Sequence, residues 1–278
     1  MNIERLGPNI GARISGFDLR LLQPSHREML RGLLEEHLVL FFVGQALNLD
    51  EFQQFGEVMG ELKRGVATPG FRGPDDYVIR IEVPAGVRRG GYADRWHTDE
   101  PYLEEPNYAT ILMPECLPSS GGDTCWASMY AAYDLLSEPL QRLADALDAT
   151  HSTAGRFKGE WTHPVVRLNP RTGRRALYVN SIFTREIANV SAQESKEILD
   201  MFVRLATPPE VQVRYKWTPD TVAVWDNRFS QHYAVSDYSE PRRMFRLLVR
   251  GEPVVGLREP AHGERAQTAE AGIAAAQA

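Results

Sequence analysis

The chain has 278 residues, of which 43% are hydrophobic and 24% are charged, and this composition excludes a disordered protein because the apolar fraction can fill a sizeable core. Its 31 Lys and Arg against 37 Asp and Glu give a formal net charge of −6, which disfavours a general nucleic-acid binder or a binder of anionic membranes. The longest aliphatic and aromatic run, Leu38 to Val43, is much too short to span a bilayer, and no signal-peptide core follows Met1. Only two cysteines are present, Cys116 and Cys125, so we expect reduced thiols, no disulfide framework and a cytoplasmic protein.

Two helices are predicted near the start of the chain. Ser25 and Glu28 have the spacing of a capping box, in which each side chain accepts a hydrogen bond from the backbone of the other, and they predict a helix that ends at His37. A second helix is expected over residues 50–59. The apolar segment 38–43 between them predicts a buried strand.

Most of the remaining chain predicts β-strands. Eight short segments are rich in β-branched and aromatic residues and are bounded by turn-forming residues: 77–83, 108–113, 124–128, 164–168, 175–179, 211–217, 221–226 and 245–250. The segment 169–174 suits a hairpin turn, and Ser191 and Glu194 form a capping box for a helix to about Ala206. Because helices do not alternate regularly with strands, we expect a mainly β fold, a double-layered jelly roll with helical decorations, and not a parallel α/β sheet.

No repeat or low-complexity linker divides the chain. We therefore expect one domain over residues 1–258. The Ala-rich end, residues 259–278, has no large apolar side chain beyond Ile273 and predicts a disordered tail.

A histidine and a carboxylate two positions apart provide the first chemical signal. In an extended segment, His97-Thr98-Asp99 points its imidazole and its carboxylate to one face. About one such pair is expected by chance among seven histidines, and the chain has three. The pair at 26–28 lies in a predicted helical turn and the pair at 262–264 in the predicted tail. The pair at 97–99 follows a Gly-rich polar segment, as expected of a loop that enters a site. It is therefore the best candidate for two ligands of a metal site.

His232 is the best candidate for a third ligand, because it follows the predicted strand 221–226 and precedes two arginines. A purely structural histidine is the alternative at this position. Two histidines and one carboxylate leave three octahedral positions open, which is typical of non-haem Fe(II) oxygenases. Zinc hydrolases use the same ligand types. Residues that could hold a bidentate cosubstrate would distinguish an Fe(II) oxygenase from a zinc hydrolase.

Six motifs, in order along the chain, resemble the taurine and aryloxyalkanoate dioxygenase (TauD/TfdA) family of Fe(II)/2-oxoglutarate enzymes. They are WHTD (96–99), GGDT (121–124), HPVVR (163–167), LYVN (177–180), WDNR-x-x-QH-x-A-x-x-DY (225–238) and PRRMFR (241–246). Their order and approximate spacing agree with the family from about residue 3 to residue 256. The resemblance implies a jelly-roll fold and an iron site formed by His97, Asp99 and His232.

The same resemblance implies a binding site for the cosubstrate. Thr124 and one arginine after His232 would hold the distal carboxylate of 2-oxoglutarate, a task that suits the planar guanidinium group. Arg242 and Arg243 are adjacent, and the loop before them is one residue shorter than is usual in the family. When the family pattern is aligned on the strand that follows, Arg242 takes the position of the cosubstrate residue and Arg246 that of a second active-site arginine. Strand alternation agrees, because it puts these two on one face and Arg243 on the other.

The reaction implied by the resemblance couples two oxidations. Oxidative decarboxylation of 2-oxoglutarate with O2 gives succinate and CO2, and an unactivated C–H bond of a small or medium organic acid is hydroxylated. Where that carbon carries a sulfonate, sulfate or aryloxy group, the product collapses to an aldehyde or ketone. The presence of Asp99 argues against the halogenating variant of this chemistry, which needs that coordination position for halide.

The substrate pocket departs from that of the taurine enzymes, so taurine is a poor expected substrate. The histidine they carry after a GEL segment is absent from residues 60–70, and Ala93 stands where they have asparagine. The short segment 152–162 predicts either a more open pocket or one that Phe157 and Trp161 close. Candidate substrate-facing residues are Tyr92, Glu100, Tyr102, Phe183 and Arg246. A pocket-facing Glu100 would repel an anion or pair with an amine, whereas a solvent-facing Glu100 would do neither; Phe183 lines either the pocket or the core.

Two alternatives stay open beside the dioxygenase. One is a non-catalytic jelly-roll protein with a vestigial metal pocket, which the complete ligand and anchor set disfavours. The other is a zinc hydrolase, which the lack of an obvious general base disfavours. We expect a small-molecule substrate, no nucleic-acid or membrane partner, and a homo-oligomer, either a dimer or a tetramer.

Overall fold

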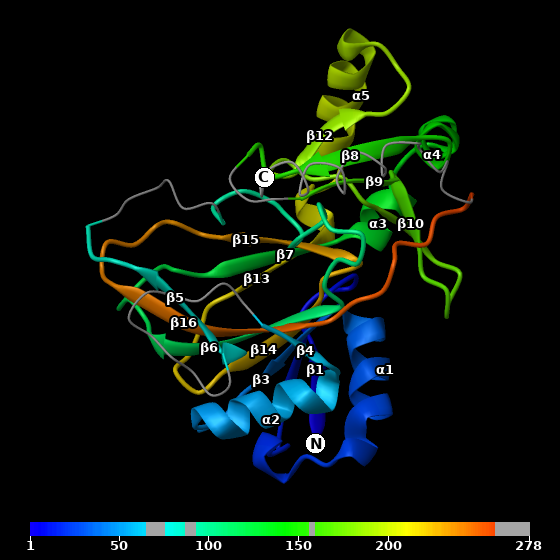
Figure 1. Ribbon diagram of the computed structural model, residues 1–278. Helices are drawn as coiled ribbons and strands as arrows, with labels where there is room; N and C mark the ends of the chain where they lie inside the picture. The colour runs from blue at the N-terminus through cyan, green and yellow to red at the C-terminus, as the bar shows by residue number, and fades with distance from the viewer. Residues whose placement is uncertain (65–75, 87–92, 156–158, 259–278) are drawn as a thin grey trace, which may run out of the picture.

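The computed structural model describes residues 1–64, 76–86, 93–155 and 159–258, and its framework is a pair of facing β-sheets (Figure 1). The larger sheet has eight strands, seven of them in the order β1 (Asn2–Arg5), β2 (Ala12–Ser15), β3 (Val39–Phe42), β14 (Val222–Asp226), β6 (Ala109–Cys116), β16 (Arg242–Val249) and β4 (Leu62–Lys63). The eighth strand, β5 (Ile79–Val83), pairs with the same strand β16, so β4 and β5 border successive stretches of it. Strands from both ends of the chain thus build one sheet.

The smaller sheet contains three antiparallel strands in the order β13 (Gln212–Tyr215), β7 (Thr124–Ser128) and β15 (Ser230–Ala234). Aromatic side chains join it to the larger sheet. The ring of Trp126 in β7 lies 5.2 Å from that of Phe41 in β3 and 5.6 Å from that of Trp225 in β14, measured between centroids. These side chains are fully buried, and the space between the two sheets is therefore a packed hydrophobic core.

A second core lies on the outer face of the larger sheet. Helices α1 (Arg27–His37) and α2 (Leu49–Met59) cover this face (Figure 1). Leu34 of α1 and Phe55 of α2 are fully buried, and the Phe55 ring lies 5.6 Å from that of Phe42 in β3. Packing on both faces explains why β3 is apolar at every position.

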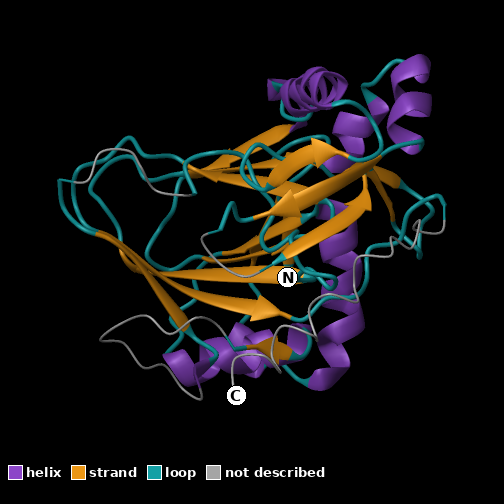
Figure 2. Cartoon of the chain, turned by 45° about the horizontal axis from the view of Figure 1, so that its top comes forward, coloured by secondary structure: helices purple, strands orange, loops and turns teal. Residues whose placement is uncertain are grey.

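The remaining elements form a lobe beside the two sheets. It comprises the sheet β12 (Thr184–Ile187), β8 (Asp148–Ser152) and β9 (Glu160–Pro164), the hairpin β10 (Val166–Leu168) and β11 (Arg175–Leu177), and helices α3 (Met129–Asp134), α4 (Glu138–Asp145) and α5 (Ala192–Leu205). Figure 2 shows helices on opposite sides of the strand layers. Within the described ranges, no helix is long and apolar enough to cross a membrane.

The predicted elements are largely confirmed. All eight predicted strands and the predicted strand 38–43 are present, the 169–174 turn joins β10 to β11, and Ser191 and Glu194 form the capping box of α5. The predicted capping box of the first helix is wrong. Gln23 and His26 form it around a short 3-10 turn (Pro24–His26), because the fixed φ of Pro24 starts the turn early, and α1 follows at Arg27. The predicted tail, residues 259–278, lies outside the described residues.

Candidate active site

The backbone holds the two histidines of the candidate metal site together. His97 lies in the segment between β5 and β6, and His232 lies in β15 of the smaller sheet. The two residues form an antiparallel bridge, with N–O distances of 3.1 Å from His97 to His232 and 2.8 Å in reverse. This single bridge fixes the backbone of His97 against the edge of β15.

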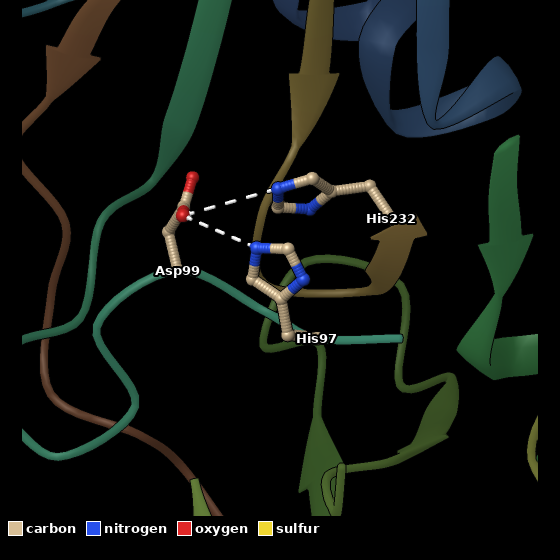
Figure 3. Close-up of side chains that lie close together, drawn as sticks. All are labelled: His97, Asp99 and His232. Carbon is tan, nitrogen blue, oxygen red and sulfur yellow. Dashed lines mark ion pairs between the residues drawn. The ribbon is translucent and has the colours of Figure 1, made fainter. Parts of the chain in front are cut away.

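The structure brings all three predicted ligands together (Figure 3). The Nε2 atoms of His97 and His232 lie 3.9 and 3.8 Å from Oδ1 of Asp99, and the three ligand atoms all lie within 4.8 Å of one another. Two ligand atoms that share an ion at about 2.1 Å can be at most about 4.2 Å apart. The carboxylate thus lies within bridging distance of each imidazole, and the buried N, N, O donor set fits Fe(II).

Neighbouring groups orient Asp99. The Thr110 hydroxyl donates to Oδ2 of Asp99 at 2.8 Å, which leaves Oδ1 facing the histidines. The amide side chain of Asn227 fixes the Asp99 backbone from both sides, because it accepts from the N–H at 2.9 Å and donates to the carbonyl at 2.9 Å. Such supporting contacts hold a metal ligand in place before the ion binds.

Burial and neighbouring charges set the protonation of the three groups. Burial alone would raise the pKa of Asp99, but the charges of His232, Arg246 and His97 and the hydrogen bond from Thr110 outweigh it and lower that pKa to about 2. Burial lowers the pKa of His232 to about 3 and also lowers the pKa of His97. At neutral pH the site therefore has one carboxylate and two neutral imidazoles, the forms that bind metal.

The tautomer of His97 follows from its hydrogen bond. Its Nδ1 lies 2.8 Å from the carbonyl oxygen of Arg95, which can only accept, so Nδ1 carries the proton. The lone pair is then on Nε2, the atom that faces Asp99. A metal-binding histidine is usually held by such a second hydrogen bond.

Arg242 is a buried cation with unpaired donors. Its side chain is only 6% exposed, and its Nε and Nη2 atoms have no hydrogen-bond partner among the described residues. Burial lowers its pKa. A buried, unpaired guanidinium is unfavourable unless an anion joins it. The unpaired nitrogens of Arg242 therefore fit the carboxylate of 2-oxoglutarate.

The GGDT motif contains the buried Thr124 and a glycine turn that passes next to Arg242. Thr124 is 2% exposed, and its hydroxyl oxygen accepts from Nε1 of Trp217 at 3.0 Å, so its proton is available to a ligand. Gly121 and Gly122 have φ values of +75° and +72°. A Cβ on Gly122 would lie 2.9 Å from Pro118 and 3.3 Å from Cδ of Arg242. The turn at Gly121 and Gly122 therefore passes close to the Arg242 side chain, where a Cβ would not fit without displacing Pro118.

Arg246 follows Arg242 on strand β16. One of its terminal nitrogens lies 3.9 Å from Oδ1 of Asp99, and its Nε has no hydrogen-bond partner in the described part of the chain. Arg243 faces away from this pocket and pairs with Glu115 at 3.1 Å. The alternation expected along this strand agrees with these contacts.

The candidate substrate-facing residues have different surroundings. Phe183 is buried, with its ring 6.2 Å from that of His97 and 5.2 Å from that of Tyr102. Phe183 therefore adjoins the metal site, and Tyr102 packs against Phe183. Glu100 is only partly exposed and forms an ion pair with Lys63. Tyr92 and Phe157 lie outside the described residues.

Three supporting residues of the site were not singled out from the sequence. Asn227 stands inside the WDNR motif, which could have suggested a role. Thr110 sits in an apolar strand segment and Lys63 in a charged one, and neither position carries a chemical signal by itself. Their roles depend on which strands pair.

Comparison with known proteins supports the oxygenase chemistry that the donor set of the site suggests. The model of the family described as "Taurine catabolism dioxygenase TauD, TfdA family" matches residues 2–248. The chain belongs to this family. It is 34% identical to an alpha-ketoglutarate-dependent sulfate ester dioxygenase of Pseudomonas putida, with 92% of each chain covered. It is 32% identical to an alkylsulfatase of Acinetobacter baylyi, covering 96% of this chain and 89% of the relative.

Among solved structures, a putative alpha-ketoglutarate-dependent taurine dioxygenase from Burkholderia xenovorans superposes with a TM-score of 0.84 and 35% identity, covering 92% of this TauD/TfdA chain and 94% of the other. The jelly-roll fold is therefore confirmed, and the protein is an Fe(II)/2-oxoglutarate-dependent dioxygenase that uses O2 and acts on a small molecule. The zinc-hydrolase and non-catalytic alternatives are set aside.

Proposed function

We propose that this dioxygenase hydroxylates an organic sulfate monoester at the carbon that carries the sulfate group. Arg246 carries this proposal: a cation with an unpaired Nε lies within 3.9 Å of Asp99 and would bind the anionic end of a substrate close to the metal. The names of two relatives, a sulfate ester dioxygenase and an alkylsulfatase, support the same substrate class. Ala93, in place of the asparagine of the taurine enzymes, argues against taurine.

We further propose the roles of the site residues. His97, Asp99 and His232 hold Fe(II), which when bound supplies the activation of O2 coupled to decarboxylation of 2-oxoglutarate. Thr124 and Arg242 bind the distal carboxylate of 2-oxoglutarate, a bidentate charge-assisted contact that fixes the cosubstrate.

Arg246 and Phe183 position the substrate in this scheme. The arginine binds the sulfate group, and the aromatic ring beside His97 excludes water from the reacting carbon. Insertion of one oxygen atom into the C–H bond gives a carbon bearing both hydroxyl and sulfate. Loss of sulfate with the hydroxyl proton then yields an aldehyde.

The metal and cosubstrate roles can be tested by spectroscopy. Anaerobic addition of Fe(II) and 2-oxoglutarate is expected to give a visible charge-transfer band, which His97→Ala or Asp99→Ala should abolish. Absence of the band in the wild-type protein, with tight zinc binding instead, would contradict the assignment.

A turnover screen tests the substrate class. Succinate release should be fastest with alkyl sulfate esters and slower with sulfonates, aryloxy acids and amino acid derivatives. Sulfate and an aldehyde should appear in equal amounts with succinate. A preference for aryloxy acids, or succinate formation without sulfate release, would overturn the substrate proposal while leaving the reaction class intact.

We also propose that residues 1–258 form one domain and that the protein acts as a homo-oligomer in the cytoplasm. Pairing of strands from both ends of the chain in one sheet supports one domain. The free cysteines, Cys116 and Cys125, support a reducing compartment. Exposed Leu135 and Trp161 support self-association. Light scattering that gives the mass of one chain would contradict the oligomer.

A further inference from the structure

An ion pair lies directly beside the metal site and is not required by the chemistry above. It joins Lys63, at the end of β4, to Glu100, the residue after Asp99. The two side chains are 23% and 25% exposed, so water screens the pair only in part. Lys63 also donates to Oδ1 of Asn107 at 3.2 Å, which fixes the ammonium group in position.

Strand register shows which face of the sheet Lys63 occupies. Lys63 is opposite Leu248 of β16, and Leu248 is opposite Thr110 of β6. Side chains that are opposite one another in neighbouring strands lie on one face of a sheet. Thr110 on this face donates to Asp99, and Arg246, two residues before Leu248, shares the face. Lys63 is therefore a second cation on the side of the sheet that faces the metal site.

The backbone of Glu100 has an uncommon conformation. Its φ is +53°, in the left-handed region, which side chains other than glycine adopt at a cost. In this conformation the Glu100 carboxylate contacts Lys63, while the preceding carboxylate, of Asp99, faces the histidines. Two successive acidic side chains thus point to different partners.

In the enzyme loaded with Fe(II) and 2-oxoglutarate, the charges around the site sum to a single positive charge. The two charges of Fe(II) and the one of Arg242 balance the two of 2-oxoglutarate and the one of Asp99. Lys63 and Glu100 cancel, which leaves the charge of Arg246 for the substrate. We propose that the Lys63–Glu100 pair is a charge filter, which makes the pocket select substrates with one negative charge over substrates with two. This inference rests on the proposed function, in which Arg246 binds the anionic end of the substrate.

Two esters of the same shape and different charge test the charge filter. Hexyl sulfate carries one negative charge, and hexyl phosphate carries about two at about pH 8 because its second pKa is near 6. Dissociation constants are measured anaerobically on the enzyme loaded with Fe(II) and 2-oxoglutarate, from the change in the visible band. Wild-type protein is expected to bind hexyl sulfate more tightly than hexyl phosphate.

Substitutions at the pair should change this preference in a defined order. Glu100→Gln frees the Lys63 charge and should improve binding of hexyl phosphate relative to hexyl sulfate about tenfold. The double variant Lys63→Met/Glu100→Gln, again without net charge, should return the ratio to within about twofold of wild type. Glu138→Gln is a matched control, because it removes the same charge from an exposed ion pair on α4 and should leave the ratio unchanged.

The outcomes separate this inference from the proposed function. An unchanged ratio in Glu100→Gln overturns the charge filter alone. Loss of the anaerobic band in Glu100→Gln would also overturn it and would assign the pair to metal positioning. Wild-type protein that binds neither ester would overturn both the charge filter and the sulfate-ester proposal.

Discussion

At the scale of single residues, the site contains side chains whose interactions are completed only by ligands. Among the described residues, nothing pairs with two buried nitrogens of Arg242 or with the buried Nε of Arg246. Leaving a buried cation unpaired costs several kcal/mol, and a bound carboxylate offsets much of this cost. Cosubstrate binding is therefore expected to stabilise the folded protein as well as to prepare it for reaction.

Replacing Arg242 should affect the cosubstrate selectively. Arg242→Ala removes a charge-assisted contact worth about 2–3 kcal/mol and should raise the KM for 2-oxoglutarate about 30- to 150-fold. Fe(II) affinity should change little. The neighbouring Arg243→Ala, which removes a partner of Glu115 outside the pocket, is the matched control and should leave this KM within about twofold of wild type. Equal effects of the two substitutions would refute the assignment of Arg242.

The hydroxyl of Thr110 should matter for metal affinity. Thr110→Val keeps the shape of the side chain but removes the hydrogen bond to Oδ2 of Asp99. Loss of such a supporting contact weakens metal binding about 10- to 100-fold. Titration of the metal-free protein with Fe(II) under anaerobic conditions measures the effect. Thr110→Ser, which retains the hydroxyl, should bind nearly as tightly as wild type.

At the scale of elements, short-range patterns in the sequence predicted the helices and strands that short-range interactions stabilise. The apolar strand segments and the α5 capping box follow from side-chain alternation and from a four-residue hydrogen-bond pattern, and both are present. Strand β15 was missed because its residues, SQHYA, are mostly polar and show no alternation. Its pairing with β7 and with His97 stabilises it instead.

The same reasoning explains the candidate site. The pair at positions 97 and 99 was visible because an extended segment has a two-residue period. The contacts of Lys63 with Glu100 and of Thr110 with Asp99 could not be predicted from the sequence, since they depend on the order of strands in the sheet. Register between distant strands is not encoded in any short segment.

The cap of α5 gives a prediction at this scale. Ser191→Ala removes the acceptor for the backbone N–H of Glu194 and should lower the free energy of unfolding by about 1 kcal/mol. Because α5 lies in the lobe beside the two sheets, kcat/KM should not change. Urea unfolding and succinate release measure the two quantities. A fall in kcat/KM without a loss of stability would contradict this division.

At the scale of the whole molecule, two cores share one sheet. The larger sheet buries one face against the smaller sheet and the other against α1 and α2. Its inner face carries the residues that surround the metal site, and its outer face carries none of them among the described residues. Packing of α1 and α2 on the outer face therefore helps to hold the strands that position the metal-site residues on the inner face.

Acid should destabilise the whole fold through buried histidines. Burial lowers the pKa of His163 to about 4, against 6.5 for an exposed histidine, and burial also lowers the pKa of His151 strongly. The unfolded chain binds a proton as the pH falls below about 6.5, and the folded chain does not until about pH 4. Stability is therefore lost across this window, by about 3 kcal/mol for His163.

Urea unfolding at several pH values between about 7.5 and 4.5 tests this expectation. The variant His163→Gln keeps a donor for the carbonyl of Leu103, which His163 contacts at 2.9 Å, but cannot titrate. Its stability should fall less steeply with acid than that of wild type. The same pH dependence in both proteins would show that His163 is not buried in its neutral form.

The bridge between His97 and His232 also constrains how the protein acquires its iron. The two residues are far apart in the sequence, and the bridge joins His97 to a strand, β15, that pairs with β7 on its other edge. During synthesis the chain presents His97 and Asp99 long before it presents His232. A nascent chain thus holds an incomplete set of donors and retains the ion weakly. Iron incorporation should accordingly be a late step of folding, which protects the unfinished chain from oxidative damage by its own cofactor.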